Sequence, residues 1–110
     1  MSNRERRRHP RITAFLPLRL IAVGGKVEAA PAPLLTLNIS KAGVCFPIPR
    51  RIDRGEFIEV EVTLLGAGLH REDVLISSTG QVVRVEAGRK PGWYKLAAVF
   101  DEPPSSATNS

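Results

Sequence analysis

The chain is poor in several residue types, and each shortage removes a class of protein. Its 110 residues include one cysteine, Cys45, so a disulfide framework is excluded and a reducing compartment is the default. Two histidines and that single cysteine do not make a zinc site. Aromatic residues make up only 5% of the chain, which argues against a nucleic-acid-binding sheet built on stacking side chains.

Long apolar runs are also missing. No stretch approaches the roughly 20 apolar residues that span a bilayer as a helix. The basic start of the chain leads into ITAFLPLRLIAVGG, whose proline and internal charge do not fit a signal peptide. The N-x-S sequon at Asn38 has meaning only in a secreted protein, and nothing else in the sequence indicates secretion. We therefore expect a cytoplasmic protein with no membrane span.

What the chain does contain is enough for one globular domain. Hydrophobic residues make up 43% of it and charged residues 25%, and a domain of this length can bury a core without disulfides or metal. The net charge of +5 is unevenly spread, because five arginines and one glutamate lie within the first 11 residues. Such a cluster is either a solubilising tail or one part of a localised anion site.

Short extended stretches at close spacing predict an all-β fold. Phe57–Leu65 alternates apolar and polar residues, and the Gly24-Gly25 pair between two extended stretches is a hairpin signal. The predicted strands cover residues 13–23, 34–39, 43–48, 57–65, 74–86 and 93–100, with Gly80 as a bend or bulge. Six strands in so short a chain must pair antiparallel, and closing the sheet removes exposed edges.

We therefore predict a six-stranded antiparallel β-barrel with little or no helix. The basic residues 1–11 form a flexible N-terminal arm, residues 12–102 form the barrel, and residues 103–110 form a disordered tail. No catalytic set can be argued from spacing. His9 lies in the basic arm, His70 lies in a polar loop, and the carboxylates are scattered over strands and turns. The sequence indicates neither an enzyme nor a cofactor.

Two motifs remain that could bind a ligand, and the first is in the arm. Arg7 and Arg11 form an R-x-x-x-R pair, and Pro10 stiffens the segment just before the first strand. A preorganised pair of guanidinium groups binds an anion better than a floppy pair. Arg4 and Arg8 fit the same pattern but lie further from the first strand, so we prefer Arg7 and Arg11. Arg6 and Arg8 then either add contacts or raise the local positive potential.

The second motif is NISKAG, residues 38–43, between two predicted strands. Asn38 and Ser40 are short polar side chains that can hydrogen-bond a nucleotide base or phosphate, and Gly43 permits a sharp turn or a close backbone approach. The alternative is structural, because Asn and Ser are also ordinary turn residues that cap their own backbone.

In this order, the two motifs resemble the signature of the PilZ domain, a bacterial receptor module for cyclic di-GMP. That signature is R-x-x-x-R followed by D/N-x-S-x-x-G, and Asn38, Ser40 and Gly43 complete its second half. GQVVRV at Gly80–Val85 and YKLAAVFDE at Tyr94–Glu102 resemble the late strands of the family, whose fold is a six-stranded antiparallel barrel. DEPPSSATNS offers no apolar face for the C-terminal helix of many members, so either this version lacks that helix or the sequence stops before it.

The resemblance implies a ligand and a role for each motif residue. Arg7 and Arg11 clamp guanine and phosphate of cyclic di-GMP, with Arg6 and Arg8 nearby, because arginine forks bind both groups and stack on bases. Asn38 and Ser40 supply hydrogen bonds from the barrel, and Gly43 keeps the turn open. Binding orders the arm and signals to a protein partner.

Two other functions stay open at this stage. One is a PilZ-like protein-interaction module that does not bind nucleotide, and the other is a barrel that binds nucleic acid through its basic arm. Selective binding of the cyclic dinucleotide would exclude both, whereas salt-sensitive binding to any oligonucleotide would favour the second. The sequence leaves the oligomeric state and the regulated process open.

Overall fold

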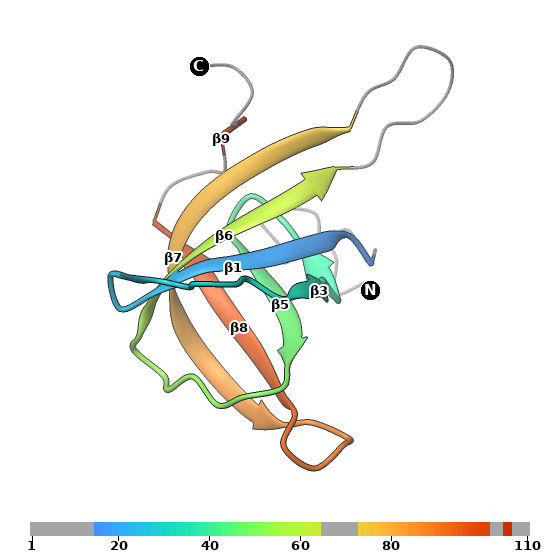
Figure 1. Ribbon diagram of the computed structural model, residues 1–110, viewed down its shortest axis with the longest axis vertical. Coiled ribbons are helices and arrows are strands. Elements are labelled where there is room, and N and C mark those ends of the chain that lie inside the picture. Colours follow the sequence, from blue (N-terminus) through green and yellow to red (C-terminus); the bar gives the residue numbers. More distant parts are fainter. Residues whose placement is uncertain (1–14, 65–72, 102–104, 107–110) are drawn as a thin grey trace, which may run out of the picture.

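The computed structural model of the chain describes residues 15–64, 73–101 and 105–106, and all regular structure in them is β (Figure 1). Every strand pair is antiparallel. The strands are β1 (Pro17–Val23), β2 (Lys26–Val27), β3 (Pro33–Leu35), β4 (Asn38–Ile39), β5 (Gly43–Ile48), β6 (Phe57–Leu64), β7 (Val74–Ala87), β8 (Tyr94–Phe100) and β9 (Ser105–Ser106). The predicted all-β antiparallel class is confirmed. Among these residues there is no helix that could cross a membrane.

One curled sheet contains all of these strands. Its order is β2-β1-β6-β7-β8-β5-β4, with β3 also pairing with β1 and β9 with β7 (Figure 1). The segment that holds β3 and β4 joins opposite ends of this order. The Thr36 amide donates to the carbonyl of Leu16 at 2.9 Å, and the Leu37 amide donates to the carbonyl of Cys45 at 2.8 Å. The single strand predicted over residues 34–39 is therefore wrong in detail, because its halves pair with different partners.

The Gly24-Gly25 hairpin is confirmed. Both glycines have positive φ angles, 59° and 81°, and Val23 pairs with Lys26 across them. Two successive positive φ angles are the geometry of a type I′ turn, whose twist matches that of the flanking strands. The glycine pair thus turns β1 into β2, leaving the other side of β1 to pair with β6.

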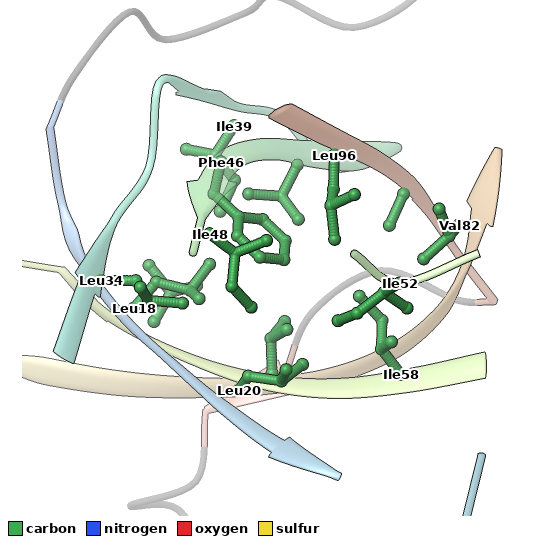
Figure 2. Packing of buried hydrophobic residues seen from close by; sticks show 14 of the residues in the cluster. Leu18, Leu20, Leu34, Ile39, Phe46, Ile48, Ile52, Ile58, Val82 and Leu96 are labelled. Carbon is green, nitrogen blue, oxygen red and sulfur yellow. The ribbon is translucent and has the colours of Figure 1, made fainter. Parts of the chain in front are cut away.

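The core lies inside the curl of the sheet, and Figure 2 shows side chains from several strands converging there. The alternation in β6 is confirmed for Ile58, Val60 and Val62, which are at most 3% exposed, whereas Leu64 at the strand end is exposed. Cys45 is buried, as expected of a small apolar side chain. The core cluster comprises Leu18, Leu20, Leu34, Ile39, Val44, Phe46, Ile48, Ile52, Ile58, Val60, Val62, Val82, Leu96, Ala98 and Phe100.

The irregularity predicted at Gly80 lies elsewhere in β7. Gly80 stays in register opposite both Ile58 and Phe100, and the register between β7 and β8 shifts between Val82 and Arg84. Gly80 instead permits a close approach, because a β-carbon added there would lie 2.5 Å from the carbonyl oxygen of Val99. The bulge therefore belongs to residues 82–84.

Part of the predicted tail pairs with the sheet. Ser105 and Ser106 form β9, which pairs with Ser77 and Ile76 of β7. Pairing of this kind uses the backbone of an available strand edge, so a polar composition does not prevent it. The predicted disorder of residues 103–110 stays a prediction. The predicted arm, residues 1–11, lies outside the described residues.

Candidate functional site

The NISKAG segment is the tip of the hairpin between β4 and β5. The Ser40 amide donates to the carbonyl of Gly43 at 2.9 Å, which closes the turn. The Ala42 amide donates to the Ser40 hydroxyl oxygen at 3.1 Å. Ser40 thus caps its own turn, as the structural alternative expected. Its hydroxyl group still has a proton to donate, because a serine hydroxyl is both a donor and an acceptor.

Asn38 lies on the outer face of the sheet, by which we mean the side turned away from the core cluster. It pairs with Cys45 across β4 and β5, while its neighbour Ile39 is buried in the core. The Asn38 side chain is half-buried. Its amide group offers two N–H donors and a carbonyl acceptor, which suit the edge of a purine base.

A glycine is required at position 43 because the chain packs closely against β8 there, and not because of an unusual backbone angle. It pairs with Val99, and a β-carbon added to it would overlap the carbonyl oxygen of Ala98. It is not among the glycines with positive φ in the part of the chain that the structure describes. The preceding carbonyl, that of Ala42, accepts the Phe100 amide at 2.8 Å. The turn is therefore pressed onto β8 by its glycine and by a backbone hydrogen bond.

The outer face next to this turn carries small side chains. Cys45 pairs with Ala97 of β8, and Ala97 in turn pairs with Arg84 of β7. Beyond them lies a charged group in which Glu86 contacts Arg84 at 3.7 Å and Lys95 at 3.1 Å. Sequence reasoning placed Arg84 in a strand but gave it no role.

A cavity of about 570 Å³ lies further along, at the end of the β7–β8 hairpin. Its walls include Leu37, Pro47, Trp93, Tyr94 and Lys95, but none of the three motif residues Asn, Ser and Gly of the turn. The motif therefore sits on an open sheet surface beside this hollow, and a ligand bound there would lie across the face. The described residues contain no group of three or more His, Cys, Asp or Glu side chains that could hold a metal ion.

The arginines of the first motif, Arg6, Arg7, Arg8 and Arg11, lie outside the described residues and remain predictions. The described residues begin at residue 15, and two hydrogen bonds hold Leu16. Leu16 donates its amide to the Thr36 hydroxyl at 3.0 Å and accepts the Thr36 amide at 2.9 Å. Thr36 is two residues from Asn38, so Leu16 lies close to the segment that leads into the turn.

Comparisons with known proteins bear on the family and the fold of the chain. The family model of the PilZ domain matches residues 5–109. A solved structure of the inhibitor of motility (MotI/DgrA) of Bacillus subtilis superimposes with a TM-score of 0.67 at 19% identity, covering 88% of this chain and 43% of that one. The chain thus spans less than half the length of that protein, and the likeness concerns the fold. No curated protein matches the chain. Because the family model covers nearly the whole sequence, the chain belongs to the PilZ domain family.

Proposed function

We propose that the chain is a cyclic di-GMP receptor domain, with the nucleotide held between the outer face at the β4–β5 turn and the arginine arm. The observation that carries the proposal is the position of the N-x-S-x-x-G residues. In a chain of the PilZ family, they form the tip of one hairpin, and Leu16, which follows the arm in the sequence, is hydrogen-bonded to Thr36 just before that hairpin. PilZ domains are receptor modules rather than enzymes, so binding is the activity to test.

The chemistry of the ligand suits the groups at this turn. Cyclic di-GMP carries two phosphate charges and two guanine bases. Arg7 and Arg11 would bind phosphate oxygens and a guanine edge through paired N–H donors. Asn38 would bind a base edge from the sheet, and Ser40 would donate its hydroxyl proton, since its oxygen already accepts from Ala42. Lys41, exposed at the tip of the turn, adds positive charge.

Signalling would then follow from the arm. A mobile basic segment that folds across the ligand changes the surface that a partner protein meets. Leu16, which follows the arm in the sequence, donates its amide to the Thr36 hydroxyl, and this supports a change beside the turn. We therefore propose that the domain acts by contacting a protein partner in the cytoplasm once the nucleotide is bound.

A second function is favoured by two contacts at the turn. The Ser40 hydroxyl caps Ala42, and Gly43 packs against the backbone of Ala98. Both motif residues therefore have structural roles. A protein-interaction module that binds no nucleotide would also need Ser40 and Gly43 for these roles. Only a binding measurement separates this alternative from a receptor.

Calorimetric titration with cyclic di-GMP tests the proposal, with GTP and cyclic GMP as controls. A receptor should bind the cyclic dinucleotide selectively, with one or two molecules per chain. Absence of heat with all three nucleotides would contradict the receptor function and support the interaction module. Equal binding of all three would show that the site recognises charge but not the macrocycle.

A further inference from the structure

A β-bulge in β7 turns Arg84 outward. Val82 faces the core at 1% exposure, so simple alternation would point Val83 outward and Arg84 inward. Instead, the register between β7 and β8 shifts between Val82 and Arg84, and both Val83 and Arg84 are exposed. Val85 then packs against the core again. Bulges commonly re-aim a side chain in this way, and they are frequent beside functional sites.

The strand register places Arg84 in one row with Asn38. Arg84 pairs with Ala97, Ala97 with Cys45, and Cys45 with Asn38, across β7, β8, β5 and β4. The row spans three strand spacings, or about 14 Å between its end residues. The two middle side chains are small, and the row has a polar amide at one end and a guanidinium group at the other.

Glu86 currently supplies the negative charge at the Arg84 end. Its carboxylate lies 3.7 Å from Arg84 Nε and 3.1 Å from Lys95 Nζ, and all three side chains are about half exposed. A separation of 3.7 Å is too long for a hydrogen bond, and exposed ion pairs are weak. One carboxylate thus faces two cations, leaving an excess positive charge at this end of the row.

We propose that Arg84 is a further ligand-contacting residue, binding a phosphate group of the nucleotide at the end of the row opposite Asn38. Glu86 acts as an internal counter-ion that the phosphate replaces. This inference rests on the proposed function, because it assigns an additional contact within the same site. A phosphate offers the guanidinium fork two oxygens, which the carboxylate at 3.7 Å does not engage.

The test compares the affinity of the full chain for cyclic di-GMP across four variants. Arg84→Gln should weaken binding by about 10- to 100-fold, the range expected for loss of a charge-assisted hydrogen bond. Arg84→Lys, which keeps the charge but not the fork, should recover part of that loss. Glu86→Gln should strengthen binding by about two- to fivefold, because a weak competing ion pair is removed.

Arg19→Gln is the matched control, because Arg19 is an exposed strand arginine that pairs with Glu61 on β6. Its affinity should stay at the wild-type value, and the melting temperatures of all variants should confirm folding. If Arg84→Gln binds like Arg19→Gln while the wild type binds normally, the role of Arg84 is overturned and the receptor function stands. A weaker Glu86→Gln would overturn the counter-ion role. A wild type that binds no cyclic di-GMP would overturn the proposed function and this inference with it.

Discussion

Gly43 and Val99 lie directly opposite each other where β5 pairs with β8, and a β-carbon on Gly43 would overlap the carbonyl oxygen of Ala98. On its other side, β8 meets Gly80 of β7, where an added β-carbon would lie 2.5 Å from the carbonyl oxygen of Val99. The backbone of β8 is therefore approached closely from both neighbouring strands. Of the two glycines, Gly43 belongs to the candidate site and Gly80 does not.

Gly43→Ala should destabilise the domain by about 1–3 kcal/mol, because the new methyl group must displace the backbone of β8. It should also weaken binding of cyclic di-GMP, since the turn moves with the glycine. Gly80→Ala is the control, with a comparable steric conflict away from the turn. Thermal unfolding and calorimetry of both variants check this, and a Gly43→Ala protein of unchanged stability would contradict the packing argument.

Arg7→Ala and Arg11→Ala should each weaken binding of cyclic di-GMP by one to two orders of magnitude. Each removes a charge-assisted interaction worth about 1.5–3 kcal/mol, and neither should change the melting temperature. Arg4→Ala and Arg8→Ala are measured beside them by calorimetry. Larger losses for Arg4 and Arg8 than for Arg7 and Arg11 would show that the arm binds in the other register.

Ser40→Ala should weaken binding less than either arginine variant. The hydroxyl oxygen already accepts the Ala42 amide, so the change removes one neutral hydrogen bond to the ligand and one turn cap. The cap contributes about 1 kcal/mol to stability. A small decrease in melting temperature together with a modest loss of affinity is expected. An effect on affinity that exceeds that of Arg11→Ala would reverse this ranking.

Ser78→Ala should leave the domain as stable as the wild type or make it more stable, by about 1 kcal/mol. The Ser78 hydroxyl oxygen is buried in β7 and has no hydrogen-bond partner in the part of the chain that the structure describes. Burial of an unpaired hydroxyl group is costly, and alanine removes that cost. Ser77→Ala serves as the comparison in chemical denaturation. Clear destabilisation by Ser78→Ala alone would contradict the prediction.

Local signals in the sequence predicted the elements that depend on few residues. Alternation identified the buried face of β6 at Ile58, Val60 and Val62, and the glycine pair identified the first hairpin. The split between β3 and β4 escaped prediction, because it depends on which strands lie on either side of Thr36. The bulge in β7 escaped too, since Val82 and Val83 are both apolar and only packing decides which faces inward.

The candidate site divides in the same way. The three residues of the N-x-S-x-x-G motif lie within six consecutive positions, so their place in one turn was predictable from the sequence alone. Arg84 lies 46 residues beyond Asn38 in the numbering, and only the register of four strands brings the two into one row. No periodicity within a single strand carries that information, because register is set by cross-strand packing and by bulges.

The neighbouring amides of Thr36 and Leu37 donate to different neighbouring segments, one to Leu16 and the other to Cys45. This short stretch therefore connects the segment before β1 with β5, and Asn38 follows it directly. Asn38 itself pairs with Cys45, so a ligand at the turn would be held through β5 as well as through these two bonds. The position of the turn therefore depends on both bonds, because each one joins this segment to a different part of the chain.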